Sequence, residues 1–187
     1  IFNRKKETRT LDMSDPLLQA LLNQSAITRT EAMGIPSIAF CVNLIKNTVA
    51  MTPIKLYEMK DGKVTELADD PRVALLNDNT GDIMTGYQMK RAMVKDYLLD
   101  GVGSAYINRD RNKAKSLHYV KRSAMSFSVG VDPIFKKVDI LVGGKPYRDC
   151  DFLRITRDTE DGVTGIGIVA ENNLLLSVMY NSLKYEN

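Results

Sequence analysis

Residues that build metal and redox centres are scarce in this sequence. It has one histidine, His118, and two cysteines, Cys41 and Cys150, which lie far apart and belong to no Cys-x-x-Cys unit. Structural zinc sites need four Cys or His ligands at short spacing, so we expect no metal site of that kind. The two cysteines are predicted to be inert free thiols, Cys41 in a helix and Cys150 in a loop or strand edge, which fits a reducing cytoplasm.

Long apolar runs are also missing. No stretch of the sequence approaches the roughly 20 apolar residues that a membrane-spanning helix needs. The residues after Ile1 do not lead into the apolar core of a secretion signal. We therefore expect no membrane partner. Because Ile1 is not a start methionine and a helical pattern is still running at Tyr185, we interpret the chain as part of a longer protein.

An excess of charge of one sign is absent too. The net charge is +3, and 44% of the residues are hydrophobic, which is enough for a globular core. A protein that grips DNA through its phosphates usually carries a denser basic stripe, so DNA that passes this protein would be guided and not held. The basic residues Arg4, Lys5, Lys6 and Arg9 are predicted to lie on a solvated arm.

The sequence offers no catalytic constellation. His118 lies in an extended stretch, and no motif supplies the carboxylate and nucleophile that a catalytic triad requires. The acidic groups Asp69–Asp70 and Asp158–Asp161 fall in polar, turn-like segments and are interpreted as solvated loop charges. Gly162, Gly165 and Gly167 match neither common phosphate-binding pattern, which favours a structural hinge. We predict no catalytic, cofactor-binding or metal-binding residue, no cofactor and no enzymatic activity.

Helical periodicity is clear in two places. Pro36–Met51 is predicted to be a helix that ends before Pro53, and its apolar residues are expected to form ordinary core. These residues are Ile38, Val42, Ile45 and Val49. A second helix is expected from Thr85, where Gln88 completes a capping box, to Gly101, with Met89, Met93, Tyr97 and Leu98 on its buried side.

The rest of the pattern indicates turns, strands and a closing helix. A hairpin is predicted around Asp61-Gly62, a short helix after Pro71, and one antiparallel sheet over residues 104–155. A long helix should then begin near Ile168 and run to the end of the chain. Its apolar stripe fits either core within one subunit or contact with a neighbouring subunit. The predicted fold class is α+β: an antiparallel sheet and hairpins packed with several helices, ending in a long helix.

The order of these elements resembles portal proteins of the HK97 phage family over roughly residues 35–180. The segments that carry the resemblance are Met51-Thr52-Pro53-Ile54-Lys55-Leu56-Tyr57-Glu58, Asp70-Pro71 with Ala74-Leu75-Leu76-Asn77, Met84-Thr85-Gly86-Tyr87, Gly101-Val102-Gly103-Ser104-Ala105-Tyr106-Ile107 and Asp161-Gly162-Val163-Thr164-Gly165. The sequence departs from the family at Asn77–Thr80, where a Pro-Asn-Pro turn is expected, and at Gly167-Ile168, where Ser-Pro is expected.

The resemblance implies a domain organisation and a mechanical role. Residues 1–34 would be a polar N-terminal arm, 35–165 a portal wing-like domain, and 166–187 the start of a long helix that leads to the stem. The subunit would form a dodecameric ring that passes double-stranded DNA during packaging and ejection.

The resemblance also implies partners and a location. The partners would be the terminase large subunit, the major capsid protein and a head–tail adaptor. The protein would be found at the portal vertex of the virion and, during assembly, in the host bacterial cytoplasm.

Two other function classes stay open at this point. The chain could be a non-enzymatic α+β interaction domain of another phage assembly protein, such as a head–tail adaptor. It could also be a small enzyme that uses a surface carboxylate pair, which would require two acids with perturbed pKa values in one pocket.

Overall fold

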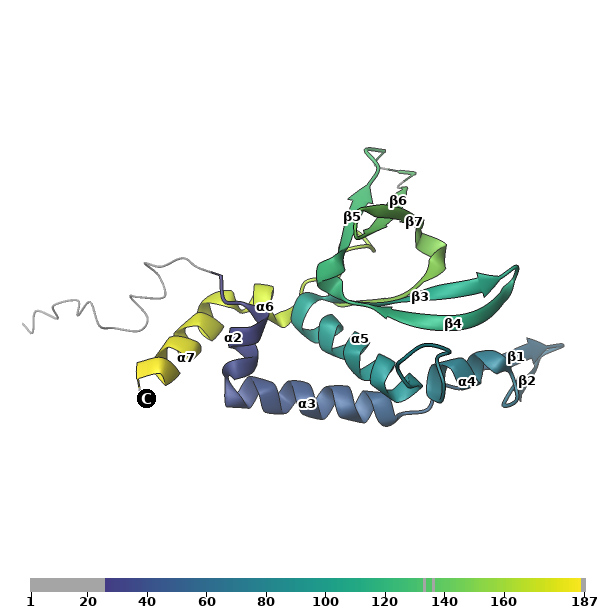
Figure 1. Cartoon of the computed structure of the whole chain (residues 1–187), viewed down its shortest axis with the longest axis horizontal. Helices are drawn as coiled ribbons and strands as arrows, with labels where there is room; N and C mark the ends of the chain where they lie inside the picture. Colours follow the sequence, from purple (N-terminus) through teal and green to yellow (C-terminus); the bar gives the residue numbers. More distant parts are fainter. Residues whose placement is uncertain (1–25, 133, 136, 186–187) are drawn as a thin grey trace, which may run out of the picture.

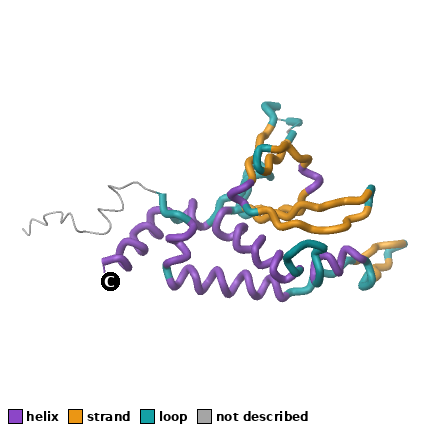
Figure 2. Tube along the Cα trace, in the orientation of Figure 1, coloured by secondary structure: helices purple, strands orange, loops and turns teal. Residues whose placement is uncertain are grey.

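A layer of helices and a layer of strands make up this α+β fold (Figure 1, Figure 2). The computed structural model describes residues 26–132, 134–135 and 137–185. Its helices are α2 (Arg29–Gly34), α3 (Pro36–Met51), α4 (Pro71–Asn77), α5 (Gly86–Asp100), α6 (Ile168–Glu171) and α7 (Asn173–Tyr185), with short 3-10 turns η1 (Arg122–Ala124) and η2 (Asp149–Asp151). Its strands are β1 (Tyr57–Lys60), β2 (Lys63–Glu66), β3 (Val102–Asp110), β4 (Lys113–Val120), β5 (Met125–Val129), β6 (Val138–Val142), β7 (Lys145–Arg148) and β8 (Phe152–Thr156). The predicted fold class is confirmed.

The ends of α3 and α5 lie where local sequence signals placed them. Pro36 occupies the first turn of α3, where its missing N–H has no helical partner to lose. Thr85 and Gln88 form the predicted capping box at the start of α5. Gly101 ends α5 in the left-handed conformation with φ 86°, which glycine adopts without strain. These signals act within a few residues, so the sequence alone determines them.

The predicted core stripe of α3 is only partly buried. Val42 is 2% exposed and packs inward, but Ile45 is 43% exposed and Val49 is 46% exposed. The expectation that this helix forms ordinary core was therefore wrong for half of the stripe. One side of α3 packs against α5 in the fold, and that side is narrower than the apolar side of the helix.

The strands form three separate sheets and not one. In the first, β3 lies between β4 and β8, and all pairings are antiparallel. In the second, β6 lies between β5 and β7; β7 was not predicted. The third sheet is the β1–β2 hairpin, which turns at Asp61-Gly62 as predicted. Helix α5 covers one face of the first sheet, where Met89 and Met93 pack on Ala105 and Leu117.

The end of the chain is not one continuous helix. The predicted long helix is interrupted at Asn172, which separates α6 from α7 with a non-helical φ of −113° and ψ of 28°. Helix α2, which was not predicted, packs between α3 and α7. The core of this part of the molecule consists of Ile27, Ala32, Ile35 and Leu176. The predictions for Arg4–Arg9 and for residues 17–22 lie outside the described residues.

Candidate functional site

The most unusual chemistry in the molecule surrounds Asp96, an acid on the buried side of α5. Its side chain is 0% exposed, and Oδ1 lies 2.6 Å from Nη2 of Arg29. Its other oxygen accepts hydrogen bonds from the Tyr119 hydroxyl at 2.6 Å and from the backbone N–H of Arg122 at 3.2 Å. A buried carboxylate needs such partners, because losing water costs a charged group several kcal/mol.

Arg29 connects two turns of α5 to the N-terminal segment. Its guanidinium pairs with Asp96 and also with Asp100, one turn further along the helix. Planar guanidinium groups suit this task, because they donate in a fixed fork and stay charged at every physiological pH. The pair of acids on α5 thus holds α2 in place.

Titration of this cluster reflects its burial. Burial raises the pKa of the Asp100 carboxyl, partly opposed by the charge of Arg29. Burial, followed by the hydrogen bond to Asp96, raises the pKa of the Tyr119 phenol well above its usual value. Burial alone would lower the pKa of Arg29, but the hydrogen bond and charge of Asp96 together with the charge of Asp100 raise it. The phenol of Tyr119 therefore keeps its proton, and with it the hydrogen bond to Asp96, above the pH at which a tyrosine usually ionises.

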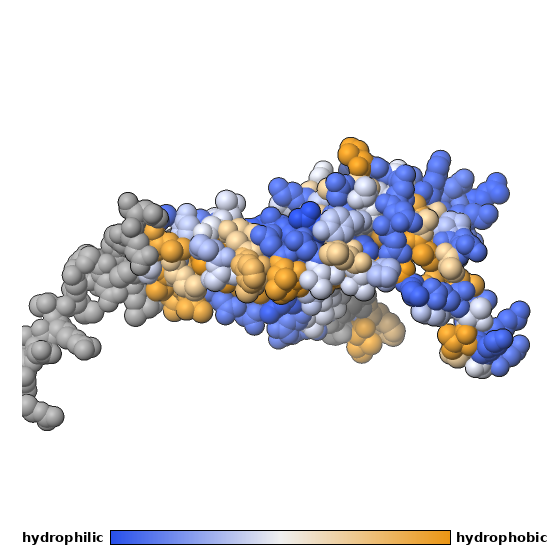
Figure 3. Space-filling model, turned by 90° about the horizontal axis from the view of Figure 1, so that it is seen from below, coloured by the Kyte–Doolittle hydropathy of each residue, from blue (hydrophilic) through white to orange (hydrophobic). Residues whose placement is uncertain are grey.

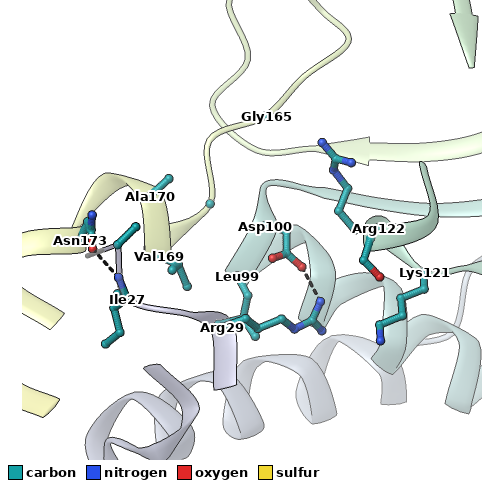
Figure 4. A pocket seen from close by; sticks show the side chains of 13 residues that line it. Ile27, Arg29, Leu99, Asp100, Lys121, Arg122, Gly165, Val169, Ala170 and Asn173 are labelled. Atoms are coloured by element: carbon teal, nitrogen blue, oxygen red, sulfur yellow. Dashed lines mark hydrogen bonds and ion pairs between the residues drawn. The ribbon is translucent and has the colours of Figure 1, made fainter. Parts of the chain in front are cut away.

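A cavity of about 590 Å³ lies beside this cluster, between α2, the end of α5, η1 and α6 (Figure 4). Its polar lining includes Arg29, Asp100, Arg122 and Asn173, which come from segments far apart in the sequence. The backbone N–H of Ile27 donates to Oδ1 of Asn173 at 2.9 Å and so ties the N-terminal segment to the start of α7. The N-terminal segment and the start of the last helix therefore meet here. We call this region the junction.

Two glycines, Gly165 and Gly167, let the segment before α6 pack directly against the end of α5. A Cβ on Gly165 would lie 2.1 Å from the carbonyl oxygen of Gly101, and one on Gly167 would lie 2.1 Å from that of Leu99. Real Cβ atoms do not come that close to backbone, so both positions require glycine. The segment that leads into α6 thus lies directly on the end of α5.

Asp161 stabilises the loop that leads to Gly165 and Gly167. Its carboxylate accepts hydrogen bonds from the backbone N–H groups of Val163 and Thr164, both at 2.7 Å, and from the Thr164 hydroxyl at 2.6 Å. These hydrogen bonds, with the Thr164 hydroxyl contributing most, hold the pKa of the Asp161 carboxyl far below its usual value. This explains the Asp-Gly-x-x-Gly pattern: the acid closes the turn, and Gly165 fits against Gly101.

Arg157 fastens the same loop to α6. Its backbone N–H donates to the Gly101 carbonyl at 2.8 Å, and its guanidinium donates to the Ile166 carbonyl and the Glu171 carboxylate, both at 2.7 Å. One residue therefore joins the exit of β8, the end of α5 and α6. The junction is a structural joint that fixes how the chain leaves the sheet and enters its last helices.

His118 has neighbours that the sequence did not reveal. Its Nδ1 lies 3.3 Å from Oδ2 of Asp82, and its Nε2 lies 2.8 Å from the hydroxyl of Ser116. No sequence motif indicated this arrangement. Ser116 is only 5% exposed, and its hydroxyl also accepts from the Asn108 side chain at 3.1 Å. A nucleophile must be reachable by its substrate, and Ser116 is almost completely buried. We therefore interpret these hydrogen bonds as a structural link between β4 and the loop of residues 80–84.

The remaining candidates from the sequence have local structural roles. Asp70 caps α4 and pairs with Arg72, which lowers its pKa to about 2. Within residues 26–132, 134–135 and 137–185, no group of three or more His, Cys, Asp or Glu residues could hold a metal ion. Cys41 on α3 and Cys150 in η2 are exposed free thiols. The structure brings none of the acid groups named from the sequence into the junction except Asp161, which shapes its loop.

Sequence reasoning missed Arg29, Asp96 and Tyr119. Asp96 carried a usable signal, because it follows Met93 by three residues and Met89 by seven, on the side of the helix that packs inward. A charge at such a position requires a buried partner. Its partners come from α2 and β4, and no local pattern in those segments points to α5.

A comparison with known protein families identifies the family to which this chain belongs. The family model described as phage portal protein matches residues 36–176, from α3 to α7. The chain belongs to the phage portal protein family. That family is structural, and the match covers every element that forms the junction except α2 and the residues before it.

Solved structures show the same fold. An HK97 family phage portal protein from Corynebacterium diphtheriae is 18% identical, with a TM-score of 0.61 over 86% of this chain and 48% of that one. A chain from the neck of an empty GTA particle is 19% identical, with a TM-score of 0.67 over 90% of this chain and 45% of that one. A chain from the virion of a native gene transfer agent is 18% identical, with a TM-score of 0.61 over 91% of this chain and 49% of that one.

The chain spans about half the length of these solved relatives. No curated protein matches it significantly. In the described part of the portal chain, no helix is both long and apolar enough to cross a membrane.

Proposed function

We propose that this portal chain supplies the wing of a ring-forming subunit through which double-stranded DNA is packaged into, and ejected from, a phage head. The observation that carries the proposal is the family match over residues 36–176, which includes all three sheets, every helix from α3 to α6 and the start of α7. The shared fold with the Corynebacterium diphtheriae portal protein supports it.

The proposal assigns a role to each part of the chain. Residues 1–34 form an N-terminal arm, of which α2 is anchored at the junction by Arg29. Residues 35–165 form the wing, and residues 166–187 lead toward the stem of the ring. The junction then sets the direction in which the chain leaves the wing.

The chemistry of the chain suits a conduit. The net charge of +3 is small, and strong phosphate contacts would retard DNA that has to slide. The partners in this proposal are further copies of the subunit, the terminase large subunit, the major capsid protein and a head–tail adaptor. Hydrolysis of ATP belongs to the terminase, and the subunit itself acts mechanically at the portal vertex of the virion after assembly in the host cytoplasm.

The mass and shape of the full-length protein test the proposal. We expect closed rings of about twelve subunits in native mass measurements and electron micrographs, since soluble homo-oligomers adopt closed symmetry. An axial hole wide enough for duplex DNA is part of the expectation. A stable monomer or dimer at high concentration would contradict it and favour a head–tail adaptor or another assembly domain.

A further inference from the structure

Helix α7 packs on α2 and on the residues at either end of α2. The core that they share consists of the buried residues Ile27, Ala32, Ile35 and Leu176. The backbone N–H of Ile27 also donates to the side chain of Asn173, the first residue of α7, at 2.9 Å. Leu174 and Leu175 on α7 are more than half exposed, and apolar side chains are visible at this end of the molecule from below (Figure 3). In the described chain, α7 therefore packs mainly on α2 and on its neighbour α6, and we call α2 with α7 the two-helix unit.

Two single residues join the two-helix unit to the rest of the chain. Ile35 lies between α2 and α3 in an extended conformation, with φ −80° and ψ 116°, and Pro36 has no N–H with which the helical hydrogen bonds could continue. Asn172 separates α6 from α7, and in the described chain no backbone hydrogen bond joins a residue of α6 to a residue of α7. Residues at the ends of helices absorb the changes in φ and ψ when packed elements change direction. Ile35 and Asn172 are therefore placed to act as hinges.

The element on the far side of each hinge is fixed to α5. Beyond Ile35, α3 packs along α5 (Figure 1). Before Asn172, α6 is held on the end of α5 by the close approach of Gly167 to the Leu99 carbonyl. Ile38 of α3 and Val169 of α6 also touch the core of the two-helix unit, and each lies only three residues from a hinge. Contacts so near a hinge are displaced little when the unit turns.

One side chain holds the two-helix unit against α5. In the described chain, Arg29 is the only residue of α2 whose side chain forms an ion pair or a hydrogen bond with α5, and it pairs with both Asp96 and Asp100. The cavity of about 590 Å³ lies beside these pairs, between α2, the end of α5 and α6 (Figure 4). Tightly packed interiors resist displacement, whereas this space leaves α2 room to move relative to α5.

We propose that the two-helix unit turns relative to α5 about Ile35 and Asn172, and that Arg29 is the latch that holds it in the orientation seen here. With Arg29 paired to both acids, the unit stays against α5. With these pairs broken, the unit swings and α7 changes its direction relative to the sheets. The inference goes beyond the proposed function and does not depend on a ring, because every contact in it lies within one chain. It gives α7 a second orientation while the fold of the wing is kept.

Distances between two spin labels in the full-length protein, measured by pulsed electron paramagnetic resonance, test the inference. The native cysteines, Cys41 and Cys150 among them, are first replaced by serine. Labels at the exposed positions Thr30→Cys on α2 and Lys184→Cys on α7 then report a distance within the two-helix unit. Labels at Thr48→Cys on α3 and Lys184→Cys report the distance from the wing to the unit. Co-expression with an excess of the cysteine-free chain keeps each labelled pair within one subunit.

With the latch intact, both label pairs should give one narrow distance distribution. Arg29→Ala should widen or shift the wing-to-unit distribution, by at least about twofold in width, because a second orientation becomes populated. Asp100→Asn removes one of the two pairings, leaves Asp96 with Arg29, and should have a smaller effect in the same direction. The distance within the unit should stay unchanged in both variants. Arg72→Ala, which breaks an exposed ion pair on α4, is the control and should change neither distance.

A wing-to-unit distribution that stays narrow in both latch variants would overturn the inference. A distribution that widens within the unit would also overturn it, because α2 and α7 would then separate instead of turning together. If Arg29→Ala does not fold, the result for Asp100→Asn decides alone. Rings that form while the wing-to-unit distance stays fixed in Asp100→Asn and Arg29→Ala would leave the proposed function intact.

Discussion

Arg29 on α2 and Asp96 on α5 form an ion pair in which the carboxylate is completely buried, with 2.6 Å between Nη2 and Oδ1. The pair connects the segment before the matched family region to the centre of that region. Removing Arg29 alone would leave the Asp96 carboxylate buried without a cation. Loss of one partner is therefore expected to cost more stability than the pair as a whole contributes.

We therefore expect Arg29→Ala to destabilise the chain by about 3 kcal/mol, the range found when one partner of a buried ion pair is removed. Urea unfolding followed by circular dichroism measures this. Arg72→Ala is the control, because Arg72 also pairs with an aspartate but is 59% exposed. The control should have a much smaller effect, since exposed ion pairs contribute little. Equal losses in both variants would contradict the role of the junction.

Gly165→Ala should destabilise the fold by about 2–3 kcal/mol, because the added methyl group would overlap the Gly101 carbonyl and force the backbone apart. Thermal or urea unfolding gives the magnitude. Gly130→Ala is matched to it, since a Cβ at Gly130 meets its nearest atom at 3.4 Å. That variant should be close to neutral. A harmless Gly165→Ala would mean that the loop does not lie on the end of α5.

Removing the Thr164 hydroxyl with Thr164→Val should raise the pKa of Asp161, because that hydroxyl is the largest of the contributions that lower it. A pH titration of the carboxyl carbon by NMR measures the shift. Thr159→Val should raise the pKa by less, because the Thr159 hydroxyl contributes least. The reverse order would contradict the hydrogen bonding of the loop.

The same titration has a consequence for stability. The folded-state pKa of Asp161 lies below its unfolded value, so the stabilisation is present above the usual aspartate pKa. It is lost as the pH falls through the folded value. We expect the amide signals of Val163 and Thr164 to stay unchanged as the pH falls through about 4, the usual aspartate value, and to change only well below it.

Tyr119 should resist ionisation at alkaline pH. Burial and the hydrogen bond to Asp96 raise its folded pKa, so stability is complete below the unfolded value and declines as the pH rises above it. Tyr119→Phe should reduce the stability lost between about pH 9 and pH 11, on either side of the usual tyrosine value. Unfolding curves at both pH values test this, with Tyr57→Phe as an exposed control. Equal alkaline losses in wild type and Tyr119→Phe would contradict it.

Local sequence signals predicted the parts of the fold that depend on a few neighbouring residues. Pro36, the Thr85–Gln88 capping box and Gly101 placed the ends of α3 and α5 correctly. Burial was harder, because periodicity shows that a helix has an apolar side and cannot show what covers it. The exposure of Ile45 is the example.

The junction was not predictable for a related reason. Asp96 meets Arg29 and Tyr119 only after α2, α5 and β4 have packed together, so its position on the helix could indicate burial but not its partners. The break at Asn172 is similar, since helical periodicity continues on both sides of it. The order of the elements was predictable from the sequence, and that order was sufficient to identify the family.

The contact between Gly101 and Gly165 has a mechanical consequence. Because backbone touches backbone with no side chain between, there is no soft layer in which the end of α5 and the entrance to α6 could slide past each other. A force that reaches the entrance to α6 would pass to α5, and to the sheet that α5 covers, with little loss of displacement. These two segments would then move as one stiff unit, and a pivot between them and α7 would lie at the break at Asn172.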